Sequence, residues 1–166
     1  DNFHVASSTD YSDQAFNGDR VFAAKFLKPK RWDLVVFRAP PHYQGEEQGT
    51  PVVWVRRIVG LPGEEITIKG GQVFANGQVL TVPDSLRGLE YESNLPRLPG
   101  WGSPDRPAKL SDDEYYVLGD FSRISVDSRF WQVNSNRPGR FAVAESDIKA
   151  VITHVYWPLS RWRAFK

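Results

Sequence analysis

The stretch EITIKGGQVFANGQVL, residues 65–80, constrains the fold more than any other part of this chain. It holds short runs of β-type residues, a Gly-Gly pair, and the dipeptide Asn76-Gly77. Asn-Gly is a strong short-range signal for a tight β-hairpin, because both central residues of that turn need positive φ angles. We therefore predict a strand, a Gly-Gly turn, and a second hairpin closed by Asn76-Gly77.

Similar β-type runs, bounded by Gly, Pro or Lys, recur along the chain and predict an all-β fold. The further expected strands cover residues 20–26, 33–39, 51–63, 115–120 and 148–157. Strand alternation within 51–63 places Arg56 on the face of Trp54 and Ile58, and Arg57 on the opposite face. Residues 144–147 are expected to form a single helical turn. Because helix is otherwise scarce, an α/β nucleotide-binding fold is not expected.

The length and composition indicate one domain over residues 1–166. The Pro-rich residues 81–113 have little periodicity, and we expect them to form an extended insertion over the surface of that domain. The net charge of +1 gives no broad nucleic-acid surface. With no cysteine and three widely separated histidines, no metal or other cofactor is expected. No apolar run reaches about 18 residues, so a membrane anchor is expected outside this chain.

Three blocks together carry a family resemblance. They are GDRVFAAKF with KRWDLVVFRAP, then VRRIVGLPGEEITIKGGQVFANGQVL, then YYVLGDFSRISVDSRFW. In order and spacing they resemble bacterial type I signal peptidase, the membrane-anchored enzyme that removes secretory leader peptides. The resemblance covers about residues 15–158, apart from 81–113. Trp32 stands where this family usually has Gly.

The resemblance implies a fold, a mechanism and a location. The fold would be a β-sandwich-like arrangement of coiled sheets with a second β-rich lobe. A serine would attack the scissile carbonyl, and a neutral lysine would accept its proton. Extended signal peptides or preprotein segments, with small residues at −1 and −3, would lie along a strand edge. The location would be the extracytoplasmic face of the bacterial cytoplasmic membrane.

The position of the family's base lysine, directly before Arg-x-Val-Gly-x-Pro-Gly, holds Arg56 in this chain. Arginine cannot replace that lysine, because its guanidinium stays protonated in proteins and offers no acceptor. Lys25 and Lys69 lie in strand or turn contexts and are interpreted as solvated surface residues. Arg56 could also be an ordinary strand residue that contacts a Trp ring through a cation–π interaction.

The position of the family's nucleophile falls at Asp10 when it is counted back from Gly18, and at Thr9 when it is counted from an aromatic residue upstream. Neither position holds serine. Ser7 or Ser8 falls where the family often places an oxyanion-hole hydroxyl. The alternative is that this polar stretch is an ordinary solvated loop.

The third block keeps Ser125, Asp127 and Arg129 of the family's S-x-D-S-R motif. If this stretch is extended, the three side chains point to one face. The resemblance implies that the serine orients the base and that the Asp–Arg pair braces the site. The family's neighbouring Asn-Arg is Phe121-Ser122 here, and a later Asn is Ile124.

Three functional hypotheses are open at this stage. The chain could be an endopeptidase with an unrecognised nucleophile, a non-catalytic family member that binds peptides or partners, or an unrelated β-rich binding module. The substituted Ser and Lys positions favour the second. The tail at 154–166 alternates aromatic and basic residues, so it is either a packed last strand with a frayed end or a contact with an anionic membrane surface.

Overall fold

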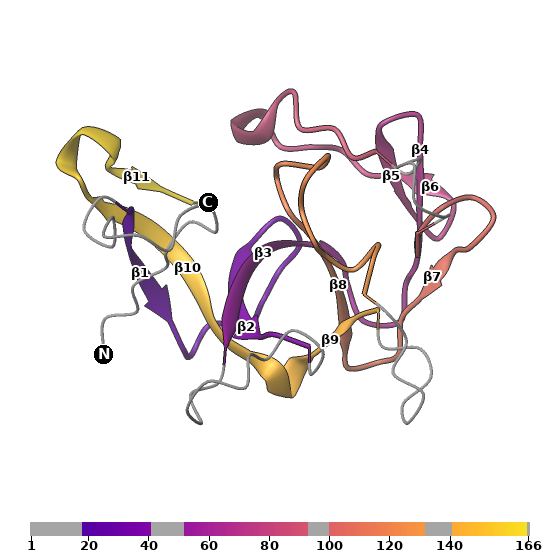
Figure 1. The fold of residues 1–166 in the computed structure, drawn as a ribbon, viewed down its shortest axis with the longest axis horizontal. Helices are drawn as coiled ribbons and strands as arrows, with labels where there is room; N and C mark the ends of the chain where they lie inside the picture. The colour runs from indigo at the N-terminus through magenta and orange to yellow at the C-terminus, as the bar shows by residue number, and fades with distance from the viewer. Residues whose placement is uncertain (1–17, 41–51, 93–99, 132–140, 166) are drawn as a thin grey trace.

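The computed structural model describes residues 18–40, 52–92, 100–131 and 141–165, and these form two antiparallel sheets (Figure 1). The strands are β1 (Arg20–Ala24), β2 (Leu34–Arg38), β3 (Val53–Gly60), β4 (Glu65–Lys69), β5 (Gln72–Ala75), β6 (Gln78–Val79), β7 (Ala108–Lys109), β8 (Glu114–Leu118), β9 (Val143–Ala144), β10 (Ile148–Trp157) and β11 (Arg163–Ala164). Three short 3-10 turns lie at Asp84–Leu86, Glu145–Asp147 and Leu159–Arg161. The all-β prediction is confirmed. Within these ranges, no helix has the length and apolar character needed to cross a bilayer.

The two sheets differ in size and position. The seven-stranded sheet has the order β1-β10-β2-β3-β8-β9, and β11 also pairs with β10. The four-stranded sheet has the order β6-β5-β4-β7. In Figure 1, β1, β10 and β11 lie at one end of the molecule and β4 to β7 at the other. β3 and β8 lie between these ends, and this is the region where the Arg56 and Ser125 blocks meet.

The predicted hairpins are present in the four-stranded sheet. β4 and β5 pair across Gly70 and Gly71, and β5 and β6 pair across Asn76 and Gly77. All four turn residues have positive φ, with 50° at Asn76 and 78° at Gly77. A tight hairpin of this kind needs such angles, which explains why its sequence signal was reliable.

The strand β8 belongs to both hydrophobic cores. Tyr115 and Val117 point into the cluster that includes Val35, Phe37 and Ile58. Tyr116 and Leu118 point the other way, into the cluster that includes the β4 and β5 side chains. Alternation along a strand buried on both faces produces this division. β8 therefore joins the two sheets through its side chains.

Gly60, the last residue of β3, lies in close contact with side chains of both sheets. A Cβ at this position would lie 2.6 Å from Ile66 Cγ1, 2.8 Å from Tyr116 Cβ and 2.9 Å from Leu110 Cδ1. Real Cβ atoms do not make contacts this short, and the side chains involved are buried. The glycine of the Val-Gly-Leu-Pro-Gly block is thus required by packing.

Residues 81–113 do more than cover the surface, contrary to the prediction. Tyr91, Ala108 and Leu110 from this segment are buried in the cluster with the β4 and β5 side chains. β7 within the segment also pairs with β4 and extends the second sheet. Proline-rich sequence breaks the periodicity by which buried residues are recognised, so these core contacts gave no signal in the sequence.

Trp32 adopts a backbone conformation that favours glycine, which is the residue the family usually has there. Its φ is 72°. Its backbone N–H donates to the Ile58 carbonyl at 2.8 Å, and its own carbonyl accepts from Arg57 Nη1 at 2.7 Å. The indole is partly buried against the cluster with the β4 and β5 side chains. Packing of the ring thus offsets an unfavourable backbone angle.

Comparing Trp32→Gly with Trp32→Ala separates these two contributions. Both variants lose the packing of the ring, but only alanine has a Cβ at a positive φ. We expect the free energy of unfolding of Trp32→Gly to exceed that of Trp32→Ala by about 1 kcal/mol. Urea denaturation of both variants measures the difference. A less stable glycine variant would contradict the assignment of backbone strain to this position.

Candidate active site

Arg56 and Ser125 are 69 positions apart in the sequence, and in the fold both side chains lie next to Gly119. A Cβ on Gly119 would lie 3.5 Å from Arg56 Cδ and would overlap the Ser125 side chain. Arg56 comes from β3, Gly119 directly follows β8, and Ser125 lies in the loop after it. Only glycine leaves room for this approach. Ser7, Ser8, Thr9 and Asp10 lie outside the described residues.

The Arg56 guanidinium bonds to backbone carbonyl groups. Nε and Nη2 donate to the Val126 carbonyl at 3.0 and 2.8 Å, and Nη1 donates to the Val55 carbonyl at 2.7 Å. The guanidinium carbon also lies 5.2 Å from the centre of the Trp54 ring. Burial lowers the pKa of Arg56, and the nearby Asp127 carboxylate acts in the opposite direction. Arg56 is thus a partly desolvated cation.

Ser125 does not bond to Arg56. Its hydroxyl donates to the Phe121 carbonyl at 2.9 Å. The segment from Phe121 to Arg129 is turned and not extended, so the condition under which Ser125, Asp127 and Arg129 would share one strand face is not met. The Ile124 and Ser125 backbone N–H groups both donate to the Phe121 carbonyl, which closes this segment into a turn.

Asp127 and Arg129 form the buried ion pair that the sequence allowed. Arg129 donates to both carboxylate oxygens, from Nε at 2.9 Å and from Nη2 at 2.7 Å, and both side chains are almost fully buried. Asp127 also accepts the Gly119 backbone N–H at 3.0 Å. Arg129 Nη1 donates to Ser122 Oγ at 2.8 Å and to the Glu92 carbonyl at 2.7 Å. The pair therefore positions the loop after β8 against the 81–113 segment.

Arg57 and Asp120 form a second ion pair that sequence reasoning did not identify. Arg57 Nε and Nη2 donate to the two Asp120 oxygens at 2.8 and 2.6 Å. A signal was available, because alternation placed Arg57 on a buried face of β3, and a buried guanidinium needs a carboxylate.

Tyr91 lies near both ion pairs but is not suited to act as a general base. Its ring is buried, and its hydroxyl has no hydrogen-bond partner among the described residues. Burial raises its pKa well above the usual range, and the Asp120 carboxylate raises it further. The phenol therefore stays protonated near neutral pH. A general base must be able to accept a proton at the operating pH.

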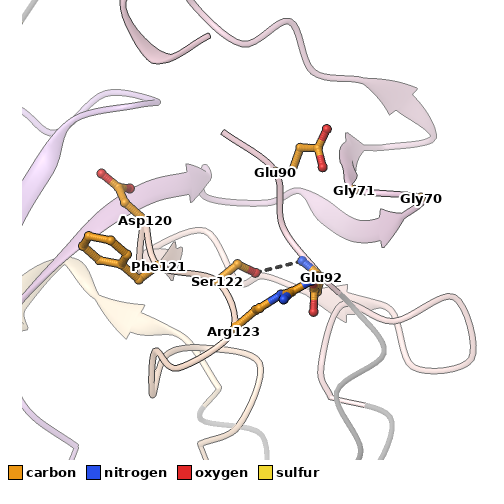
Figure 2. Close-up of a pocket in the computed structure, with 8 residues that line it drawn as sticks. All are labelled: Gly70, Gly71, Glu90, Glu92, Asp120, Phe121, Ser122 and Arg123. Carbon is orange, nitrogen blue, oxygen red and sulfur yellow. Dashed lines mark hydrogen bonds and ion pairs between the residues drawn. The ribbon is translucent and has the colours of Figure 1, made fainter. Parts of the chain in front are cut away.

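A pocket of about 430 Å³ lies next to these residues, between the β4–β5 turn and the loop after β8 (Figure 2). Its lining includes Gly70 and Gly71 on one side and residues 120–123 on the other. Glu92 and Arg123 also line this pocket, and the Glu92 carboxylate accepts a hydrogen bond from Arg123 Nε at 2.8 Å. Over the described ranges, no three His, Cys, Asp or Glu side chains are grouped as metal ligands would be.

Replacing Asp127 by Asn tests the importance of the buried pair. The change leaves the Arg129 charge buried without its carboxylate, so we expect the free energy of unfolding to fall by about 3–5 kcal/mol. Glu92→Gln is the matched control, because its pair with Arg123 is exposed and such pairs contribute about 0–1 kcal/mol. Urea denaturation measures both. Equal losses in the two variants would contradict the structural role of Asp127.

Known proteins resemble this chain in sequence and in fold. Residues 3–157 match the family described as signal peptidase, peptidase S26. Signal peptidase I P of Bacillus subtilis subsp. natto is 34% identical over 157 residues, covering 91% of this chain and 74% of that protein. Signal peptidase I of Leptolyngbya laminosa is 30% identical over 149 residues, covering 86% of this chain and 62% of that protein.

The crystal structure of a signal peptidase I from Enterococcus faecalis V583 has a similar fold. The TM-score is 0.52 at 23% identity, and the match covers 76% of this chain and 98% of the other. At this identity the likeness bears on the fold alone, and it agrees with the two β-rich parts seen here. Since the family match extends over nearly the whole sequence, the chain belongs to the signal peptidase (peptidase S26) family.

Proposed function

We propose that this domain binds extended leader-peptide segments of secreted preproteins and lacks the Ser–Lys turnover of its family. The observation that carries the proposal is the position of Arg56, which lies next to Gly119 and Ser125 where the family's base would be. A guanidinium keeps its proton, so it cannot activate a hydroxyl for attack. Asp10 or Thr9 at the proposed nucleophile position adds to the argument.

No described lysine is placed to take over from Arg56. Lys25 and Lys69 are exposed, and Lys69 ends β4 in the other sheet. The remaining lysines within the described ranges are exposed or half-buried. A lysine base needs burial against apolar groups, because desolvation is what lowers its pKa enough to leave it neutral.

The edge of β3 next to Arg56 supports peptide binding. β2 pairs with β3 along Val53–Arg57, whereas the pairing of β8 with β3 begins only at Arg57. On the β8 side, no strand among the described residues pairs with Val53–Arg56. An extended peptide could add to such an edge through main-chain hydrogen bonds.

A leader peptide with Ala at −1 and −3 tests binding and turnover together. We expect the unmodified domain to bind this peptide and to leave it uncleaved, as measured by fluorescence anisotropy and by mass spectrometry. Arg56→Lys combined with Asp10→Ser, or separately with Thr9→Ser, supplies the two missing groups. We expect one of these double variants to cleave after the −1 residue.

One result would contradict the proposed lack of turnover, and another would contradict the mapping of the site. Turnover by the unmodified domain that Thr9→Ala abolishes would show an active enzyme. Failure of both double variants to cleave would mean that the site is mapped to the wrong residues or that its supporting residues are too altered.

We also propose that the end of the molecule with β1, β10 and β11 contacts a membrane surface. β11 folds back on β10, so the tail is packed as a short hairpin and not simply frayed. The same region exposes apolar side chains, namely Phe22, Phe26, Leu27, Trp157, Leu159 and Trp162. Arg161 and Arg163 lie beside them. Trp and Arg together favour the interface of an anionic bilayer, which agrees with an extracytoplasmic location on the membrane.

Replacing Leu159 and Trp162 by Ser tests this surface. Both side chains are mostly exposed, at 72% and 62%, so their loss leaves the core intact. We expect the double variant to bind vesicles of anionic phospholipid about tenfold more weakly in a sedimentation assay. Val79→Ser is the control, because Val79 is exposed on β6 in the other sheet. An equal effect of the control variant would contradict the assignment of the surface.

A further inference from the structure

Arg56 is a partly buried cation without a carboxylate partner among the described residues. Its three hydrogen bonds go to the Val55 and Val126 carbonyls. By contrast, Arg57 and Arg129 each donate two bonds to one carboxylate. A guanidinium has five N–H donors, so two are left on Arg56 for a ligand. Because Arg56 is partly desolvated and the nearby Asp127 carboxylate is already paired with Arg129, an arriving anion would be bound favourably.

The loop that supplies the Val126 carbonyl is unusually apolar on its outside. Phe121 is 79% exposed, Ile124 is 75% exposed and Val126 is 38% exposed. In Figure 2 the Phe121 side chain points away from Ser122 and Arg123 of the same loop. Single exposed apolar residues are common, but three within six positions make a patch that suits an apolar partner. The cation and the patch are joined by the hydrogen bonds from Arg56 to Val126.

We propose that Arg56 binds the free C-terminal carboxylate of an apolar peptide, while Phe121, Ile124 and Val126 contact the side chains that precede that carboxylate. The planar guanidinium suits a carboxylate, which can accept two parallel bonds. The apolar patch suits a leader peptide, whose middle is hydrophobic. This inference rests on the proposed peptide-binding function and narrows its ligand to a cleaved chain end.

Because such a ligand is the product of a cleavage, this domain would act after another enzyme has cleaved the preprotein. Hydrolysis of a peptide bond by water leaves a new carboxylate on the upstream fragment and a new amine on the downstream one. The upstream fragment of a preprotein is the leader peptide, so it carries both the apolar segment and the carboxylate. An uncleaved preprotein has an amide at that point and offers no charge to Arg56.

Fluorescence anisotropy with two labelled peptides tests the inference. Both peptides have one apolar sequence that ends in Ala-Leu-Ala, and they differ only in a free or an amidated C-terminus. We expect the free acid to bind about tenfold more tightly than the amide, as one charge-assisted hydrogen bond would give. Arg56→Gln should reduce the affinity for the acid to that for the amide, and Arg56→Lys should keep part of the preference.

Arg123→Gln is the matched control, because it removes the same charge from an exposed position on the same loop. It should leave the preference for the acid unchanged. Phe121→Ser with Ile124→Ser should weaken the binding of acid and amide alike. Thermal unfolding of each variant establishes that it folds.

Each result separates the inference from the broader proposal. Equal affinity of the unmodified domain for acid and amide would overturn the role of Arg56 while peptide binding stands. A preference for the acid that survives Arg56→Gln would overturn it as well, since the carboxylate would then bind elsewhere. Absence of binding by both peptides would overturn the proposed function, and this inference with it.

Discussion

The buried ion pair between Asp127 and Arg129 is the interaction on which the arrangement of the site depends. Asp127 fixes the backbone at Gly119, directly after β8, and Arg129 reaches Ser122 in the following loop and Glu92 in the 81–113 segment. One pair of charges thereby holds the loop after β8 to itself and to Glu92, which is distant in sequence. Removing either partner would leave the other buried and uncompensated, which costs far more than the loss of an exposed pair. The position of the Arg56 side chain is a consequence, because its hydrogen-bond acceptor, Val126, directly precedes Asp127.

Arg56 and Arg57 show how neighbouring identical residues acquire different properties from strand geometry. Successive side chains of β3 point to opposite faces. Arg57 therefore lies next to Asp120 and forms a salt bridge with it, in which the Arg57 side chain is buried. Among the described residues, Arg56 donates its hydrogen bonds to backbone carbonyl groups and lies against the Trp54 ring. A carbonyl dipole stabilises a cation less than a carboxylate does, so Arg56 keeps more of its capacity to attract an anion. Of these two arginines, Arg57 therefore has a structural role, and Arg56 is available for binding.

The sequence predicted regular elements well and irregular ones poorly, for a physical reason. The strand at residues 148–157 and the hairpin at Asn76-Gly77 were predicted because alternation and turn chemistry are local properties. The burial of Tyr91 and the turn from Phe121 to Arg129 depend on contacts between distant segments, and no local pattern reports them. The family blocks brought Arg56 and Ser125 into one neighbourhood, but they could not reveal that Ser125 bonds to the Phe121 carbonyl. The roles of these residues in binding or turnover are still proposals.

The placement of β8 between the two hydrophobic clusters has a consequence for how the protein unfolds. Its side chains alternate between the clusters, and Gly60 presses the end of β3 against it. Opening either sheet would strip one face of β8 and expose its apolar side chains to water. The two sheets are therefore expected to melt in a single cooperative transition, in spite of their lobed appearance. The amides of Tyr116 and Val117 should exchange with solvent deuterium only when the whole domain opens, which makes them reporters of its global stability.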